Sequence, residues 1–448
     1  MKKILTIIVT LGFFTGLYAQ HSGDTLSLSL EDAVSIALSE SPTIKIDNKE
    51  LERIDYSKKS AWYALIPNLE ATGQYAKYLI PSKMSMMGQI MDSPTDFNTT
   101  LGLNLSLPLF APALWHSIQM TTLEMQAAAE KANASKVNLR NDVTKAYYNI
   151  LVVQDSYKVL QDGYELAKKN VDIAKKGHEM GTLAAYDYIS AEVQLNNLLP
   201  NIIQAQSGIN QAKTYLKILM GLDVNVPIGV TNNLADFERN IVEAATLNDL
   251  SFESNPDLRQ LEIGQMQLQR SLKLQRTQRM PTLAAFGQYG YAGMGNKETS
   301  MNLGGMPIQV KPSQNWYTQG LIVGLQLNIP ITGIFTQSVK EKQLKIQEDQ
   351  LSLQKDQAED GIRMQALTAL DKMNTAVKQV DASRKSIELS GKAYEISSKR
   401  YENGAGSMIE LQNASLAVTQ SRLSYHQAIS EYLNAKADLE KLLGKEIL

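Results

Sequence analysis

Two acidic side chains follow glycine-marked breaks in sequence that otherwise favours long helices. Asp187 stands six positions after Gly181, and Glu410 stands six positions after Gly404, in segments that are 223 residues apart. An acid in the first turns of a helix stabilises the helix dipole by about 0.3–1 kcal/mol. Carboxylates gathered around one opening would instead attract cations and raise one another's pKa. The spacing by itself leaves both interpretations open.

Other polar side chains form no catalytic or metal-binding pattern. The four histidines, His21, His116, His178 and His426, are scattered and share no metal-ligand spacing with acids. The glycine-rich segment 290–299 lacks the Gly-Lys-Ser/Thr ending of a phosphate-binding loop. Because no nucleophile is paired with a base either, we expect no enzymatic activity, no cofactor and no metal centre.

Methionine is concentrated in two segments that we expect to be loops between strands. Residues 79–97 and 292–317 contain seven of the 17 methionines: Met84, Met86, Met87, Met91, Met294, Met301 and Met306. Thioether sulfur binds soft ions such as Cu(I), so the loops could form a metal funnel. Flexible methionines also pack loops together or block an opening, and we favour this structural interpretation.

The sequence contains an internal duplication. Three blocks beginning at Glu40, Leu101 and Met180 return in the same order from Glu253, Val323 and Asn403. Their offsets, measured between matched residues, are 214, 222 and 223. This near-constant spacing divides the chain into a repeat over 20–222, a linking segment over 223–255 and a second repeat over 256–448.

Each repeat contains two expected strands, near 69–80 and 98–109 in the first and near 282–292 and 318–331 in the second. Along Leu101–Leu107, leucines alternate with small or polar residues, which predicts a strand with one apolar face. That face would meet a second sheet in a soluble sandwich, or lipid in a transmembrane barrel. Four strands cannot close a barrel alone, so the membrane interpretation requires several chains.

Two long helical hairpins are expected, over 112–221 and 336–443. The first helix of each hairpin would be on the order of 100 Å long and needs a coiled-coil partner. Heptad positions supply the seam: Tyr188, Leu195, Ile202, Ile209 and Leu216, then Leu411, Val418, Tyr425, Tyr432 and Leu439, each with a mostly small residue three positions later. Pro200 predicts a kink or break in the first repeat.

Composition points to an exported protein without thiol chemistry. Residues 1–19 have the charged start, apolar core and Ala19 cleavage site of a secretory signal. The absence of cysteine leaves no disulfide framework and no residue for a lipid anchor. A net charge of −2 argues against a nucleic-acid partner.

Three stretches together resemble the TolC-type outer-membrane efflux proteins. They are LSLEDAVSIALSESPTIK from Leu28, the IPNLEATGQY block around Pro67, and the ELQNASLAV block that follows Gly404. Each motif is loose, but their order and their doubling are specific. The resemblance covers nearly all of the chain after residue 19.

This resemblance implies a homotrimer in the bacterial outer membrane that extends into the periplasm. The fold would be mainly α with a small transmembrane β part: a trimeric twelve-stranded β-barrel continued by a twelve-helix α-barrel. The expected function is a passive exit duct of a tripartite efflux or type I secretion system. Its partners would be a periplasmic adaptor (membrane fusion) protein, an inner-membrane pump of RND, ABC or MFS type, and outer-membrane lipid. The alternative is an exported periplasmic or surface coiled-coil scaffold or adhesin without channel activity.

The resemblance also assigns roles to the glycine-marked turns. They would be the periplasmic tips where the adaptor docks, and they consist of Gly181, Thr182, Gly404, Ala405 and Gly406. The acids Asp187 and Glu410 occupy the place of the family's aperture acids. Three chains would then place six carboxylates around one constriction.

The remaining aperture positions depart from the family's pattern. Ser190 and Asn413 stand where the family has a second acid, and uncharged residues, Leu183 in the first repeat, replace its basic residue. Tyr401 matches the tyrosine of the closed-state lock, whereas His178 replaces it in the first repeat. We therefore expect a thinner acidic ring and a different lock.

Overall fold

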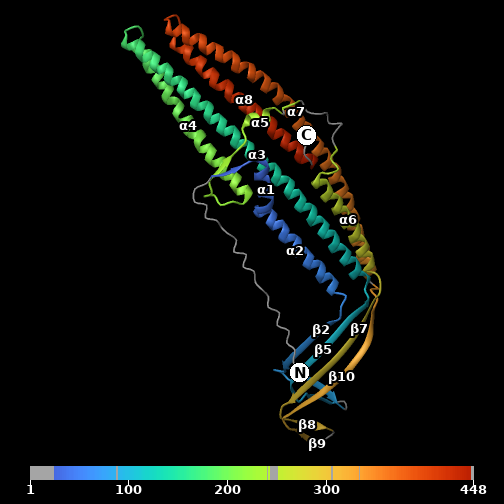
Figure 1. Ribbon diagram of the computed structural model, residues 1–448. Helices are drawn as coiled ribbons and strands as arrows, with labels where there is room; N and C mark the ends of the chain where they lie inside the picture. Colours follow the sequence, from blue (N-terminus) through green and yellow to red (C-terminus); the bar gives the residue numbers. More distant parts are fainter. Residues whose placement is uncertain are drawn as a thin grey trace, which may run out of the picture. The chain divides into compact units, whose positions relative to one another are not determined.

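The computed structural model describes residues 25–86, 89–239, 241–242, 251–303, 306–331 and 333–444. Over these residues the chain is mainly helical with a small β part, which confirms the expected fold class (Figure 1). The expected signal segment 1–19 lies outside the described residues, as do His21 and Met87. No helix in the described part is both long and apolar enough to cross a bilayer.

The chain divides into two compact units, and each unit draws on both halves of the sequence. The first, which we call the tip unit, consists of Met1–Ser41, Leu139–Ala244 and Lys372–Ala437. The second, which we call the sheet unit, consists of Pro42–Asn138, Ala245–Asp371 and Asp438–Leu448. The duplicated halves are therefore interleaved in the fold.

The sheet unit contains one antiparallel sheet of four long strands in the order β10–β7–β5–β2. Its strands are β2 (Asn68–Lys77), β5 (Thr95–Phe110), β7 (Thr282–Asn296) and β10 (Ser313–Asn328). The two strands of each repeat are neighbours, and β5 joins the repeats by pairing with β7. Strands β2 and β10 form the two edges of the sheet.

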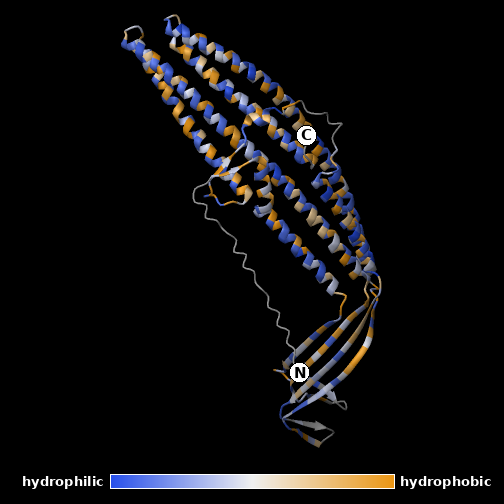
Figure 2. Ribbon diagram, in the orientation of Figure 1, coloured by the Kyte–Doolittle hydropathy of each residue, from blue (hydrophilic) through white to orange (hydrophobic). Residues whose placement is uncertain are grey.

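The apolar face of this sheet is open. Hydrophobic and polar residues alternate along the strands (Figure 2), as the sequence predicts for a strand with one apolar face. Leu103 is 47% exposed in β5, and Val323 is 73% exposed in β10. The apolar face therefore meets no second sheet in the described residues, and the soluble-sandwich interpretation lacks the layer that it requires.

The segments 79–97 and 292–317, expected to be loops, are largely β-structure, so the loop prediction is wrong. One contains the hairpin of β3 (Lys83–Met86) and β4 (Gln89–Asp92), and the other contains that of β8 (Thr299–Leu303) and β9 (Met306–Val310). The long strands also extend into them, because β5 begins at Thr95 and β7 ends at Asn296. Backbone pairing between neighbouring strands continues there although the side-chain alternation fades.

Helices lead into and out of the sheet. In the first repeat they are α2 (Pro42–Tyr63), α3 (Pro112–Glu179) and α4 (Ala185–Met220). Their counterparts are α6 (Pro256–Thr277), α7 (Gly333–Glu402) and α8 (Met408–Leu443). At about 1.5 Å per residue, the 68 residues of α3 and the 70 residues of α7 span on the order of 100 Å.

The heptad seam is confirmed by burial. None of the large residues at the seven-residue spacing in α4 and α8, and none of the residues three positions after them, is exposed. Helix α4 contains Pro200 but is continuous from Ala185 to Met220, so a break at this position is ruled out and a kink stays a prediction. Pro200 removes one backbone hydrogen bond from the helix. Buried residues on either side of it in the sequence, Ala191 before it and Ile209 and Ala212 after it, stabilise α4 by tertiary packing.

A small belt of mixed structure completes the tip unit. Strand β1 (Leu26–Leu28) pairs in parallel with β6 (Ile228–Val230), and the short helices α1 (Leu30–Glu40) and α5 (Leu234–Glu238) flank them. The buried Tyr147 hydroxyl of α3 lies 2.9 Å from the carbonyl oxygen of Leu28. The linking segment 223–255 thus contains strand β6 and helix α5, and β6 pairs with β1 near the start of the chain.

Candidate site at the helix-hairpin tips

Both hairpin tips end their first helix with the same hydrogen-bond pattern. Gly181 and Gly404 have φ values of 72° and 71°, a left-handed conformation that glycine adopts without a Cβ clash. The next amide donates to the carbonyl five residues earlier, at 2.9 Å for Thr182 and 2.8 Å for Ala405. This is the Schellman motif that commonly ends helices. Each turn is therefore set by its local sequence, and it fixes where the next helix begins.

The first tip closes over an apolar cluster rather than a charge. A Cβ on Gly177 would overlap the Leu183 side chain, so glycine at this position admits the leucine. Leu183 packs against a buried cluster of Ala174, Ala191, Tyr401, Met408 and Leu411. The residue in the place of the family's basic residue is thus part of the core that joins the two hairpins.

Tyr401 lies in that cluster with a phenolic oxygen that has no partner among the described residues. The side chain is only 2% exposed, and its hydroxyl makes no hydrogen bond within the part of the chain that the structure describes. Burial raises the pKa of Tyr401 to about 12, and the nearby charge of Asp187 contributes in the same direction. The effect of Asp187 shows that the first acid and the tyrosine of the second repeat lie close together within one chain.

Arg400 supplies a positive charge that the sequence analysis did not identify. Its Nη1 lies 3.5 Å from Oε2 of Glu410, and its Nη2 donates to the Ala405 carbonyl at 3.0 Å. The Ser407 hydroxyl accepts from the Glu410 amide at 3.2 Å and caps the start of α8. The family's basic residue would follow Gly404, whereas this arginine precedes the glycine and reaches across the turn.

The other expected aperture residues have varied surroundings. Asp187 is half-buried, and Ser190 accepts a 3.4 Å hydrogen bond from the Gln412 amide group. Asn413 is exposed and lies outside this contact. His178 is exposed, and its ring is parallel to that of Tyr188 with 6.5 Å between centroids. The structure therefore brings Asp187 near Tyr401 and Glu410 near Arg400, but it makes no single cluster of all the expected positions.

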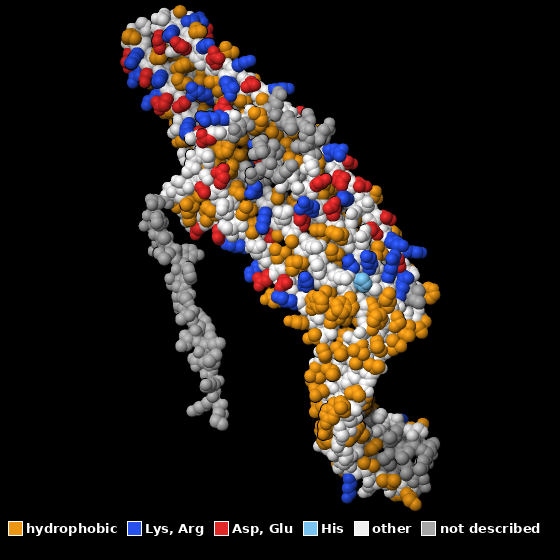
Figure 3. Space-filling model, turned by 45° about the vertical axis from the view of Figure 1, so that its right-hand side comes forward, with side chains coloured by type: hydrophobic (Ala, Val, Ile, Leu, Met, Phe, Trp, Pro, Cys, Tyr) orange, Lys and Arg blue, Asp and Glu red, His pale blue; other side chains and the backbone are white. Residues whose placement is uncertain are grey.

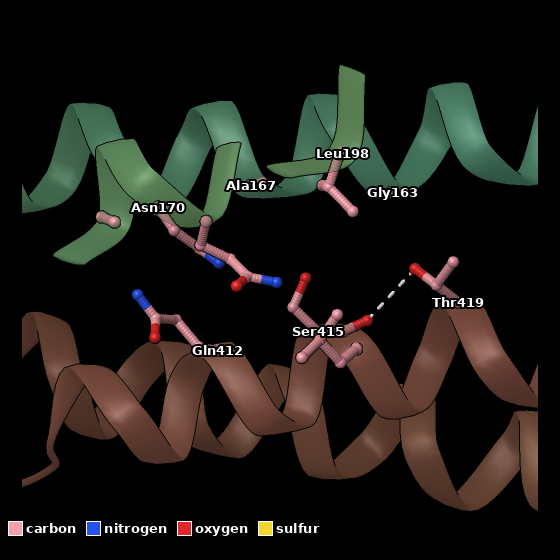
Figure 4. Close-up of a pocket in the computed structure, with 10 residues that line it drawn as sticks. Gly163, Ala167, Asn170, Leu198, Gln412, Ser415 and Thr419 are labelled. Carbon is pink, nitrogen blue, oxygen red and sulfur yellow. Dashed lines mark hydrogen bonds between the residues drawn. The ribbon is translucent and has the colours of Figure 1, made fainter. Parts of the chain in front are cut away.

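A small cavity lies between α3, α4 and α8 just inside the tips (Figure 4). Its volume is about 10 Å³, roughly the space of one water molecule. Polar atoms of Asn170, Gln412 and Ser415 lie around it (Figure 4), and Asn170 accepts a 3.2 Å hydrogen bond from the Tyr394 hydroxyl. A Cβ on Gly163 would lie 2.7 Å from the Thr419 hydroxyl oxygen, so α3 and α8 approach closely here.

Among the loop methionines, Met294 makes a described packing contact. Met84 is paired with Met91 in the backbone register of the β3–β4 hairpin, and the Met294 sulfur accepts a 3.5 Å hydrogen bond from the Thr95 hydroxyl. Met306 is 74% exposed. Among the residues that the structure describes, no three His, Asp or Glu side chains gather as a metal-binding group. The contact of Met294 agrees with the packing interpretation, and the metal funnel stays an untested prediction.

The model of the family described as outer membrane efflux protein matches residues 33–222 and 247–445. The chain belongs to the outer membrane efflux protein family. The two matched blocks follow the duplication found in the sequence, and the family membership confirms the resemblance to TolC-type proteins. A comparison with curated proteins finds no match.

Solved structures of outer-membrane channels share the fold of this outer membrane efflux protein. CusC is 16% identical, with a TM-score of 0.73 over 96% of each chain. The CmeC outer membrane channel of Campylobacter jejuni is 18% identical, with a TM-score of 0.70 over 93% of this chain and 85% of its own. The OprN channel is 15% identical, with a TM-score of 0.69 over 93% and 89%.

Proposed function

We propose that this outer membrane efflux protein is a passive exit duct and works as a homotrimer in a tripartite efflux or type I secretion system. The carrying observation is the four-stranded sheet with an exposed apolar face and two edge strands, β2 and β10. Such edges carry unpaired backbone groups that cannot remain exposed in lipid. Three sheets joined edge to edge would close a twelve-stranded barrel with its apolar face toward lipid.

The helical hairpins would continue this duct through the periplasm. Their partly polar surfaces suit the wall of a water-filled passage, and their tips would dock a periplasmic adaptor connected to an inner-membrane pump. Gly181, Thr182, Gly404, Ala405 and Gly406 are exposed or partly exposed at the tip turns, which supports this role. The pump would supply the energy and select the cargo.

We further propose that Asp187 and Glu410 line the aperture at the tips. Both acids stand in the first turn of the helix that follows a tip. In a trimer they would contribute six carboxylates, of which the three of Glu410 would be partly balanced by Arg400. This ring would favour cations, although each acid also stabilises its helix dipole.

Fractionation and reconstitution of the full-length protein test the duct. We expect it to require detergent for extraction from the outer membrane, to have the mass of a trimer, and to conduct ions in planar bilayers. The scaffold or adhesin alternative predicts a protein released by salt without detergent and silent in bilayers. That result would reject the duct, because an open apolar sheet face would then be covered by something other than lipid.

A further inference from the structure

Basic side chains gather in the sheet unit where α6 and α7 meet the sheet. We call this group the basic collar; it consists of Arg270, Lys273, Arg276, Arg279, Lys340, Lys342 and Lys345. Segment 270–281 contains no acid, and segment 333–345 contains one, Glu341. Figure 3 shows Lys and Arg side chains next to the band of hydrophobic side chains in this region.

Glu341, the single acid of segment 333–345, is paired with three basic residues of the collar, Arg276, Arg279 and, at 3.9 Å, Lys345. Arg276 donates to Oε1 of Glu341 at 2.8 Å, and Arg279 donates to Oε2 at 2.8 Å. These contacts, Arg276 first, hold the pKa of Glu341 below its ordinary value, so the carboxylate stays charged. Lys273, Lys340 and Lys342 are exposed and pair with no acid in the described part of the chain. The collar therefore keeps an excess of unbalanced positive charge.

Apolar and aromatic side chains lie between the collar and the sheet. Met280, just after α6, is 45% exposed, and Phe335, in the first turn of α7, is 80% exposed. Trp62 and Trp115, near the ends of helices that adjoin the sheet, are about half exposed, with their rings edge to face at 6.1 Å. From the sheet into the helices, the side chains are thus first apolar, then aromatic and then basic. Hydrocarbon, interface and headgroup follow one another in the same order across one leaflet of a bilayer.

The distances along the helices fit a headgroup layer. Lys273 is four residues before the end of α6, and Lys340 is seven residues after the start of α7. At about 1.5 Å per residue, these positions are roughly 6 and 10 Å along the helices. A headgroup region adds roughly 5–8 Å to each side of the hydrocarbon core. Both lysines therefore reach it with their side chains.

The charge excess is larger in the second repeat than in the first. The corresponding end of α2, residues 56–67, carries only Lys58 and Lys59, and Lys59 pairs with Asp55 at 2.6 Å. The first turns of α3, residues 112–125, contain no lysine or arginine. The basic residues are thus concentrated at the helices of the second repeat.

We propose that the basic collar binds the phosphate-bearing headgroups of anionic glycerophospholipids in the leaflet next to the helices. The ammonium groups of Lys273, Lys340 and Lys342 supply the attraction, while the Glu341 pairs hold α6 and α7 together beside them. The inference rests on the proposed function only in placing the sheet in a membrane.

Native mass spectrometry of the full-length protein in detergent tests the collar. The variant Lys273→Gln/Lys340→Gln/Lys342→Gln is compared with the parent in titrations of phosphatidylglycerol and of phosphatidylethanolamine. We expect at least roughly tenfold weaker retention of phosphatidylglycerol by the variant, because each basic residue near an anionic surface contributes about a factor of five. Retention of phosphatidylethanolamine should not change.

Two controls separate the other outcomes. Lys168→Gln/Lys169→Gln/Lys175→Gln removes three exposed lysines of α3 in the tip unit and should leave lipid retention as in the parent. Equal phosphatidylglycerol retention by the collar variant and the parent overturns the proposal. The proposal is also overturned if the collar variant no longer forms a trimer but each chain retains as much phosphatidylglycerol as in the parent. That result assigns the lysines to a contact between chains. If the parent is a trimer in detergent and conducts ions in planar bilayers, the duct stands although the collar fails.

Discussion

At the scale of single residues, the two acids in equivalent repeat positions have different neighbours. Glu410 is exposed and paired with Arg400, whereas Asp187 is half-buried and contributes to the raised pKa of Tyr401. An exposed ion pair is worth at most about 1 kcal/mol, so Arg400 matters more for local charge than for stability. The helix-dipole and aperture interpretations therefore make the most different predictions for ion selectivity.

Removing both acids tests the aperture. In Asp187→Asn/Glu410→Gln we expect weaker cation selectivity and weaker block by polyvalent cations in planar bilayers, because the ring loses its charge. Arg400→Gln should act in the opposite direction, since it releases Glu410. Arg422→Gln, which breaks the exposed 2.9 Å pair with Asp162 on α3, is the matched control and should change neither property. Selectivity and block equal to the parent in the double variant would leave only the dipole role.

Tyr401→Phe tests the unpartnered phenol. We expect no loss of stability, and a gain of up to about 1 kcal/mol, because the variant removes a buried oxygen without a hydrogen bond. The raised pKa of Tyr401 means that the parent loses stability as pH rises from about 10, the unfolded value, through about 12. The variant should lack this loss, which thermal unfolding at neutral and alkaline pH would reveal.

Tyr147→Phe is the matched control for this experiment. The Tyr147 hydroxyl lies 2.9 Å from the Leu28 carbonyl and 2.7 Å from the Asn232 side-chain oxygen. Its removal should cost about 1 kcal/mol or more. A comparable loss in Tyr401→Phe at neutral pH would show that the Tyr401 hydroxyl has a partner in the assembled protein.

At the scale of elements, the tip unit depends on how α3 and α8 cross. Gly163 admits Thr419 at this crossing, and the polar cavity lies beside it. Apolar side chains fill the cluster around Tyr401 closer to the tips. Three features thus follow one another between the two hairpins in the direction of the tips: the close approach of Gly163 and Thr419, the cavity with space for one water molecule, and the small apolar cluster.

A designed disulfide tests this crossing. A Cβ on Gly163 would lie 3.7 Å from the Thr419 Cβ, which matches the ~3.8 Å mean of disulfides. Because the chain has no cysteine, Gly163→Cys/Thr419→Cys should form one intramolecular bond on mild oxidation, seen as a shift in non-reducing gels. Moving the second cysteine one turn along, as Leu423→Cys, should abolish the bond. Absence of the bond in the first pair would mean that the helices are further apart at this level.

At the scale of the whole molecule, the open sheet face decides between lipid and water. In water, a charge on an exposed face changes stability by less than about 0.5 kcal/mol. In lipid, arginine at mid-depth costs about 2–4 kcal/mol. The two environments can therefore be distinguished by one substitution on each face of the same strand.

Leu103→Arg and Asn104→Arg are neighbouring changes on opposite faces of β5, near the middle of the strand. If the apolar face meets lipid, Leu103→Arg should lower the free energy of unfolding in liposomes by about 2–4 kcal/mol, whereas Asn104→Arg should have little effect and should alter ion selectivity instead. Denaturant titration of the folded, membrane-inserted fraction measures the difference. Equal tolerance of both arginines would contradict the lipid-facing assignment.

Local patterns in the sequence were sufficient for the repeats, the long helices, the heptad seam and the two glycine turns. Each of these depends on residues close together in the chain: Gly181 and Gly404 end helices through their own backbone freedom, and the seam follows from the helical period. The β3–β4 and β8–β9 hairpins were missed because backbone pairing there carries no clear side-chain alternation. The break at Pro200 was wrong because packing along α4 outweighs one lost hydrogen bond.

Only the tertiary structure decided which side chains meet at the tips and on the sheet. Arg400 reaches Glu410 because the turn folds α8 back beside the end of α7, and Asp187 affects Tyr401 because the two hairpins pack together. The alternating strands allowed either a buried or an open apolar face. Burial against a second layer is a property of the whole fold, and here Leu103 and Val323 remain exposed.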